Sequence, residues 1–262
     1  MILLASILFA NIATLTVPIR IGCTCILPGL GIWFKYCNTD NIQFTILVIT
    51  KGCFFIQIHD VPMLLTNLIF DLGGVLVKTH WERVTVPIAR ISCLTPQKVM
   101  DEIETGEAVH DFMLGKLDRS EFHRNFTGSL GVKLDLDAFL SMWDSVIAPN
   151  NEINPLVKNL KESYQLVLAS NTDVLHYARC LEVQQVLQLF DHLILSYELG
   201  RCKPDPEFFR SGLKRLAIPN NACVFIDDRE ENVEAAQALG IAGIQFVSTK
   251  QLETDLKDMG IL

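Results

Sequence analysis

The sequence predicts an α/β fold, in which a Rossmann-like parallel sheet forms the core and a helical cap is inserted after the first strand. From Met63 onward, short apolar runs alternate with segments of helical periodicity, which is the pattern of βαβ units. Four apolar runs end in polar side chains, as at the carboxyl edge of an open parallel sheet. Between the first two runs, roughly 75 residues show helical periodicity and almost no strand signal.

The first 62 residues differ from the rest in composition. They contain four of the eight cysteines and five charged side chains. Residues 1–19 carry no charge and are long enough for a marginal membrane span, but no basic residue precedes them as in a signal peptide. We interpret residues 1–62 as a hydrophobic N-terminal extension, untranslated or disordered, ahead of a start at Met63. A membrane anchor is the second interpretation and an additional folded domain the third. The charged residues are Arg20, Lys35, Asp40, Lys51 and Asp60.

Residues 63–77 and 152–262 are assigned to the α/β core. Gly240 is expected to end a helix over residues 230–239. Three helix starts place a capping side chain directly before a proline, namely Thr95-Pro96, Asn154-Pro155 and Asp205-Pro206. The core strands, each a short apolar run, are expected at residues 68–70, 164–169, 192–197 and 222–226.

Residues 78–151 are assigned to the helical cap. Its aromatic side chains recur at helical spacing, which favours an internal core over contacts with a substrate. Helices are expected at residues 83–91, 96–104, 107–113, 119–127 and 136–146. The aromatic residues include Phe112, Phe122, Phe139 and Trp143.

Composition excludes several classes of partner. The formal net charge is −8 and no basic run is present, so charge alone favours neither nucleic acid nor an anionic membrane surface. The cysteines show no paired CxxC pattern and no histidine cluster at zinc-ligand spacing. We therefore expect scattered reduced thiols, no structural zinc, and a cytoplasmic enzyme with no membrane partner unless residues 1–19 act as an anchor. The sequence predicts no particular oligomeric state.

Asp71 is the first candidate catalytic residue. It closes the apolar run of residues 68–70 and precedes a turn that contains Gly73 and Gly74. A carboxylate in this position can act as a nucleophile, while the glycines let the backbone approach a ligand closely. The alternative is a strand-end carboxylate that caps a turn.

Three further residues are candidates for binding a phosphoryl group. Ser170 and Asn171 follow the second strand and offer a hydroxyl, a backbone N–H and an amide. Lys203 follows the third strand and would keep Asp71 ionised while offsetting charge on the transferred group. The alternative for Ser170 and Asn171 is a turn that caps a helix beginning near Asp173.

The charges at these strand ends predict a divalent cation. Asp71, Asp227 and Asp228 bring three negative charges and a phosphate monoester up to about two more, whereas Lys203 offsets one. Mg²⁺ suits such a site because it takes oxygen ligands, keeps several waters and bridges to phosphate. The alternative for Asp227 and Asp228 is an N-cap pair on the following helix.

These four polar segments, in this order and at this spacing, resemble the haloacid dehalogenase-like (HAD) hydrolase superfamily. The resemblance spans residues 63–262. Residues 70–76 (FDLGGVL) and 225–232 (FIDDREEN) are most similar to the branch with the α-D-glucose-1-phosphate phosphatases and the phosphatase domain of soluble epoxide hydrolases. The resemblance implies a Mg²⁺-dependent phosphatase that hydrolyses a small phosphorylated metabolite, such as a sugar phosphate, through an aspartyl-phosphate.

The resemblance also implies roles for individual residues. Asp71 would be the nucleophile. The metal ligands would be the carboxylates of Asp71 and Asp228 and the backbone carbonyl of Gly73, with Asp227 orienting the waters of the metal or Lys203. The cap would close over the site and carry substrate specificity.

Gly73 departs from the family pattern. Most HAD phosphatases have a second aspartate here, which protonates the leaving oxygen and then activates water, a contribution typically of ~10²- to 10⁴-fold in rate. Water, His80 or His110 could compensate, although ordinary packing in the cap is the simpler interpretation of both histidines. Two alternatives to a phosphatase remain, a metal-free haloacid dehalogenase and a non-catalytic HAD scaffold. The specific substrate is not predicted.

Overall fold

The computed structural model describes residues 65–262 in full and, before them, only the backbone of six short strands. The chain divides into two compact units, Met1–Met63 and Leu64–Leu262. In the first unit, β1 pairs antiparallel with β2, and a second antiparallel sheet has the order β3-β4-β5-β6. The interpretation of residues 1–62 as an extension or anchor falls mostly outside the described residues and stays a prediction. The bounds are β1 Leu3–Ala5, β2 Val17–Ile19, β3 Ile26–Leu27, β4 Ile32–Lys35, β5 Phe44–Thr50 and β6 Gly52–Ile58.

The second unit is built on a five-stranded sheet in the order β11-β10-β7-β12-β13, in which every neighbouring pair is parallel. This confirms the predicted α/β fold with a parallel core sheet. β7 lies at the centre, where the strand order reverses, and an open parallel sheet places its ligands at such a point. The bounds are β7 Asn67–Phe70, β10 Gln165–Ser170, β11 His192–Leu195, β12 Cys223–Asp227 and β13 Ala242–Gln245.

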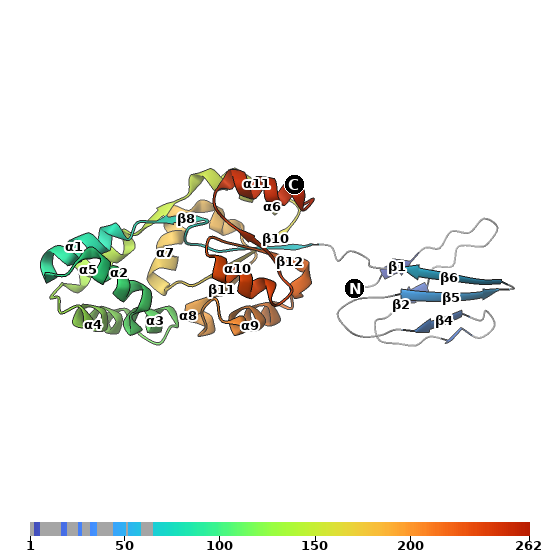
Figure 1. Ribbon diagram of the computed structural model, residues 1–262, viewed down its shortest axis with the longest axis horizontal. Helices are drawn as coiled ribbons and strands as arrows, with labels where there is room; N and C mark the ends of the chain where they lie inside the picture. Colours follow the sequence, from blue (N-terminus) through green and yellow to red (C-terminus); the bar gives the residue numbers. More distant parts are fainter. Residues whose placement is uncertain are drawn as a thin grey trace. The chain divides into compact units, whose positions relative to one another are not determined.

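Helices cover both faces of the sheet (Figure 1). Because successive strand residues point to opposite faces, Leu68 and Phe70 of β7 join one hydrophobic cluster and Ile69 joins the other. Helices α6, α7 and α11 contribute to the first cluster, and α9 and α10 to the second. Burial on both faces explains why the central strands are continuous apolar runs. The bounds are α6 Asn154–Lys161, α7 Val174–Val183, α8 Ser196–Leu199, α9 Pro206–Leu216, α10 Glu230–Gln237 and α11 Thr249–Asp258.

Five helices between β8 and β9 form the cap and lie together at one end of this unit (Figure 1). Their aromatic side chains form a packed core in which Phe112 stacks on Phe122 with ring centroids 4.2 Å apart. Trp143 packs against Phe122, Phe126 and Phe139. The predicted cap helices are confirmed within a few residues. The bounds are α1 Glu82–Ser92, α2 Pro96–Thr105, α3 Glu107–Met113, α4 Arg119–Ser129 and α5 Leu136–Asp144.

The structure corrects three details. Residues 78–151 do contain strand: β8 (Val77–Thr79) and β9 (Ile147–Pro149) pair antiparallel at the root of the cap. The strand expected over residues 192–197 ends at Leu195, because Ser196 begins the short helix α8 and its hydroxyl bonds the backbone of Thr172.

The third correction concerns Asn154. A 3₁₀ turn over Asn151–Ile153 runs directly into α6, so Asn154 has helical dihedrals and caps nothing. Thr95 and Asp205 do cap their helices, and Gly240, three residues past the end of α10, has the expected positive φ. Within residues 65–262 no helix is long and apolar enough to cross a membrane.

Candidate active site

The predicted site residues gather at the carboxyl ends of the three central strands. Asp71 follows β7 and its N–H donates to the carbonyl of Ile226, 2.8 Å away, so the sheet ladder runs up to the candidate nucleophile. Asp227 ends β12 and Ser170 ends β10. Lys203 lies in the loop before α9 and reaches the same point. The structure therefore brings together groups separated by more than a hundred residues of sequence.

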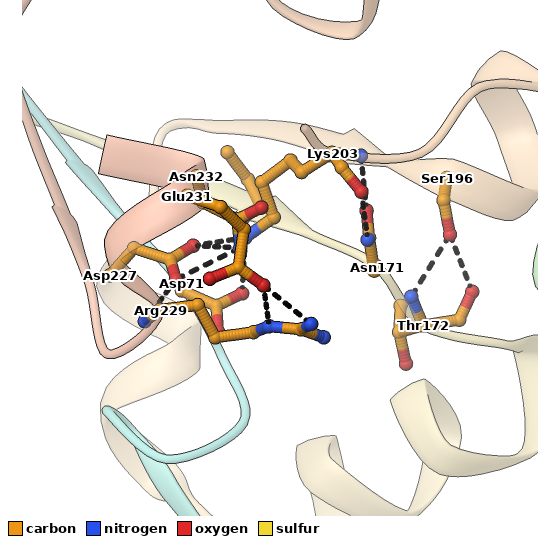
Figure 2. Close-up of polar contacts among 10 residues, drawn as sticks. Asp71, Asn171, Thr172, Ser196, Lys203, Asp227, Arg229, Glu231 and Asn232 are labelled. Carbon is orange, nitrogen blue, oxygen red and sulfur yellow. Dashed lines mark hydrogen bonds and ion pairs between the residues drawn. The ribbon is translucent and has the colours of Figure 1, made fainter. Parts of the chain in front are cut away.

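Lys203 is the centre of the site (Figure 2). Its side chain is 1% exposed, and its ammonium donates to Asp71 Oδ1 at 2.7 Å, Asp227 Oδ2 at 2.6 Å and the carbonyl of Ala169 at 2.8 Å. An ammonium has three N–H groups, so all its donors are in use. Lys203 therefore fixes the orientation of both carboxylates and brings a positive charge to the cluster.

Asp227 is fully buried and completely paired. Besides Lys203, its oxygens accept from the backbone N–H of Arg229 at 2.9 Å and from the amide of Asn232 at 3.0 and 3.1 Å. These bonds offset the cost of burying the charge. Asp227 thus holds the ammonium of Lys203, and its predicted role in the site stays a prediction. Among the described hydrogen bonds, no side chain caps the start of α10.

Asp71, Asp227 and Asp228 each offer one carboxylate oxygen within 4.8 Å of the others. Burial raises the pKa of Asp71 to about 7, against the opposing effect of the Lys203 charge. Partial burial of its carboxylate, together with the charge of Asp227, also raises the pKa of Asp228. The clustered negative charges are therefore under-compensated by one lysine, and a set of hard oxygen donors of this kind fits Mg²⁺.

The turn after Asp71 approaches this cluster closely. Gly74 has a φ of +77°, and a Cβ there would lie 2.2 Å from Asp228 Oδ2. Both the backbone conformation and the space therefore require glycine at this position. Gly73 lies in the same turn and forms a β-bridge with Val77. Its predicted role as a carbonyl ligand stays a prediction.

Asn171 has a partner that the sequence did not indicate. Its amide donates to the carbonyl of Lys203 at 2.8 Å and accepts from the N–H of Lys203 at 2.7 Å (Figure 2). These paired bonds fix the loop that carries the ammonium. Ser170 is buried beside it. The turn interpretation expected these residues to cap the following helix, but Asp173 itself is the capping residue of α7. The phosphate-binding roles of Ser170 and Asn171 stay predictions.

The two candidate histidines of the cap bind carboxylates of their own. His80 Nδ1 lies 3.0 Å from Glu82 Oε1, and His110 Nδ1 lies 3.9 Å from Asp111 Oδ1. Among the hydrogen bonds and ion pairs of residues 65–262, neither ring contacts the carboxylate cluster. Asn232, in contrast, is a site residue that the sequence analysis did not single out. Its position on the first turn of α10, five residues after Asp227, was the available signal.

The family model of the haloacid dehalogenase-like hydrolases matches residues 66–240. The chain therefore belongs to this hydrolase family. The match covers four of the five strands of the sheet, the cap and every predicted site residue, which confirms the resemblance at the level of the family. The narrower resemblance to glucose-1-phosphate phosphatases stays a prediction.

Two individual sequence relatives are phosphatases, and a structural relative is an enzyme of the same family. The chain is 25% identical over 192 residues to a D-ribitol-5-phosphate phosphatase of Bacteroides thetaiotaomicron, covering 70% of this chain and 92% of that protein. It is 24% identical over 193 residues to a sesquiterpene phosphatase of Aspergillus oryzae, covering 73% and 94%. A crystal structure of a HAD family enzyme from B. thetaiotaomicron, in complex with magnesium and inorganic phosphate, superposes with a TM-score of 0.62 at 26% identity, covering 69% of this chain and 93% of that one.

Proposed function

We propose that this protein is a Mg²⁺-dependent phosphatase of a small phosphorylated metabolite and acts through an aspartyl-phosphate on Asp71. The observation that carries the proposal is the contact of Lys203 with Asp71 and Asp227 inside a cluster of three carboxylates, at the reversal point of a parallel sheet. The phosphatase names of both sequence relatives support the reaction class, and the magnesium and phosphate in the structural relative support the ligands.

The chain's own residues divide the reaction into two steps. The charge of Lys203 favours the ionised form of Asp71 against the effect of burial, and its contact holds the carboxylate in one orientation. From there a carboxylate oxygen attacks phosphorus and the bond to the leaving oxygen breaks. Water then hydrolyses the acyl phosphate and regenerates the carboxylate. Bound Mg²⁺ would neutralise the carboxylates and the phosphoryl oxygens. Asp71, Asp228 and the carbonyl of Gly73 would hold it, and Asp227 would orient Lys203.

The leaving oxygen needs a proton, and Gly73 has no side chain to supply it. Among the described hydrogen bonds, those of His80 and His110 do not lead into the site. We therefore propose that water is the proton donor and that turnover is slow for a substrate with a basic leaving group, because general acid catalysis typically contributes ~10²- to 10⁴-fold. Substrates with acidic leaving groups, such as p-nitrophenyl phosphate, are affected least.

Phosphate release by the full chain tests the proposal. The panel contains sugar phosphates, polyol phosphates, a prenyl phosphate and p-nitrophenyl phosphate, each with Mg²⁺ or with EDTA. We expect release that requires Mg²⁺ and falls at least about 10³-fold in Asp71→Asn, since the amide is not a nucleophile. Asp137→Asn, an exposed cap residue, is the control for an equal change in charge.

The alternatives give different results in the same assay. Folded protein that releases phosphate from no member of the panel contradicts the proposal. Chloride release from 2-chloropropionate without metal would then indicate a dehalogenase, which the three clustered carboxylates disfavour because its substrate is an anion. Inactivity in both assays would indicate a non-catalytic scaffold, the interpretation that Gly73 supports.

A further inference from the structure

A buried polar cluster joins the cap to the core at some distance in sequence from the nucleophile. Asp173 and His176 lie at the start of α7 in the core, and Trp143 lies near the end of α5 in the cap. His176 Nδ1 is 3.0 Å from Asp173 Oδ2, and the indole N–H of Trp143 donates to the same oxygen at 3.3 Å. His176 Nε2 is 3.0 Å from the carbonyl oxygen of Trp143. The side chains of Asp173 and His176 are 3% and 8% exposed.

The partners of His176 define its protonation. One ring nitrogen faces a carboxylate oxygen and the other faces a carbonyl oxygen, and neither oxygen can donate a hydrogen bond. Both contacts are hydrogen bonds only when both ring nitrogens carry hydrogen, which is the imidazolium form. A neutral ring keeps only one of these two hydrogen bonds, because its other nitrogen then presents a lone pair to an oxygen.

The helix termini favour the same charges. The carbonyl of Trp143 belongs to the last turn of α5, where the partial negative charge of a helix attracts a cation such as His176. Asp173 caps the opposite kind of terminus, accepting from the N–H groups of Leu175 and His176 at 2.9 Å each. The pair therefore joins the C-terminus of a cap helix to the N-terminus of a core helix.

The charged and polar groups around His176 also favour its charged form. Burial opposes the charged form of His176, but the charge and hydrogen bond of Asp173 raise its pKa above the usual 6.5, with help from the carbonyl of Trp143 and the charge of Asp144. Burial likewise opposes ionisation of Asp173, yet His176 lowers the pKa of that carboxyl. The charge of Arg179, on α7, partly offsets the effect of burial, which raises the pKa of both Asp144 and the Cys180 thiol. The ring also stacks on Trp143, with centroids 4.9 Å apart, and packs edge-on against Trp81 of the cap.

We propose that the His176 imidazolium, paired with Asp173, is a proton-dependent latch that holds the cap against the phosphate-binding end of the core. The proposal rests on the proposed function, because Asp173 directly follows the segment Ser170-Asn171-Thr172. His176 and Asp173 are positioning residues. They act on turnover through the placement of the cap, and loss of the proton at alkaline pH loosens the contact between α5 and α7.

Two measurements on the full chain test the latch without reference to activity. In a histidine-ring NMR titration, the signal that disappears in His176→Gln should titrate above pH 6.5, since the folded protein favours the charged ring. The protection factors of amides in α5 and at the start of α7, which correct for the base-catalysed rise of intrinsic hydrogen exchange, should fall several-fold as pH rises through that midpoint. Asp173→Asn keeps an N-cap side chain but removes the charge, so it should lower the midpoint by about one pH unit or more.

The control is His123→Gln. The ring of His123 also bonds a backbone carbonyl, that of Leu134 at 2.8 Å, but it has no carboxylate partner and lies within the cap. This variant should leave the midpoint of His176 and the exchange in α7 unchanged. A midpoint at or below 6.5, or protection factors in α5 and α7 that are the same on both sides of it, overturns the proposal.

Kinetics connect the latch to the reaction. If phosphate is released, kcat/KM should decline on the alkaline side with the midpoint measured by NMR, and the decline should begin at lower pH in Asp173→Asn. A decline that does not move with this substitution contradicts the positioning role. If no phosphate is released, the proposed function fails while the NMR and exchange measurements still decide whether the latch exists.

Discussion

Two adjacent glycines in the turn after β7 meet opposite constraints. A Cβ on Gly74 would collide with the carboxylate of Asp228 and would have to adopt a positive φ. A Cβ on Gly73 would meet only a methyl group of Thr79 at 3.6 Å, which is an ordinary contact. The backbone thus requires glycine at position 74 alone, and a side chain at position 73 is compatible with the fold.

Gly73→Asp should increase the turnover of a substrate with a basic leaving group. The substitution restores a carboxylic acid at the position where most members of the family carry one, and we expect a rise in kcat of up to about 10²-fold. Steady-state phosphate release measures it. Gly73→Asn has almost the same size but no acidic proton, so an equal rise in both variants would show that proton transfer is not the cause.

Asn171 shows what the sequence could and could not reveal about a single residue. Its position after an apolar run predicted that it follows a strand of the core sheet, and it does follow β10. Its partner is the backbone of Lys203, 32 residues further along the chain, and only the folded loop defines that pairing. Asp71 and Asp227 could be singled out because each lies at the carboxyl end of a strand, whereas Lys203 lies beyond the short helix α8 and was singled out by its order in the chain.

At the scale of elements, a group of buried hydrogen bonds ties the two strands of the cap connection to the core. The amide of Gln184, at the end of α7, donates to the carbonyls of Leu76 at 2.6 Å and Asn150 at 3.1 Å. The amide of Asn150 donates to the carbonyl of Val75 at 2.8 Å. Leu76 precedes β8 and Asn150 follows β9, so one side chain fixes both the exit and the return of the chain.

Gln184→Met should destabilise the protein while changing the volume of the side chain little. The carbonyls of Leu76 and Asn150 lose a buried donor, at a cost of about 1–2 kcal/mol. Urea denaturation, followed by the fluorescence of Trp81 and Trp143, should show a lower midpoint. The neighbouring exposed residue gives the control, since Gln185→Met should leave the midpoint unchanged. Equal midpoints for both variants would contradict the role of Gln184.

The short strands β8 and β9 were not predicted, because the pairing that forms them joins distant parts of the sequence. β8 and β9 have three residues each and exist because Val77 pairs with Pro149 and Thr79 with Ile147 across the whole cap. No local periodicity can reveal a pairing of that range. The cap helices, in contrast, were predicted within a few residues because helical hydrogen bonds and amphipathic spacing are local properties of the sequence.

At the scale of the whole molecule, three carboxylates of this acidic protein gather in one cluster, in which Lys203 pairs with Asp71 and Asp227. Mg²⁺ should therefore raise the melting temperature of the native chain, because a cation that binds only the folded state stabilises it by an amount that grows with the logarithm of the ratio of its concentration to its dissociation constant. Thermal denaturation with Mg²⁺ and with EDTA measures the difference.

Asp228→Asn separates the two contributions in that experiment. Without metal, the variant should melt at a higher temperature than the native protein, because it removes a charge beside Asp227. It should also respond little to Mg²⁺. Asp258→Asn makes the same change of charge on an exposed part of α11 and should behave like the native chain. A full response to Mg²⁺ in Asp228→Asn would exclude Asp228 as a ligand.

The order of the strands has a consequence for how the chain acquires its site during synthesis. β7 is the first strand of the core sheet to be made, but its neighbours β10 and β12 begin at Gln165 and Cys223. It therefore gains its first partner only after the whole cap has been synthesised, and its second only near the end of the unit. The cap between them has its own aromatic core and is complete much earlier. If folding follows synthesis, the cap would fold before the core sheet. The complete carboxylate cluster would then form around Lys203 only when β12 pairs with β7.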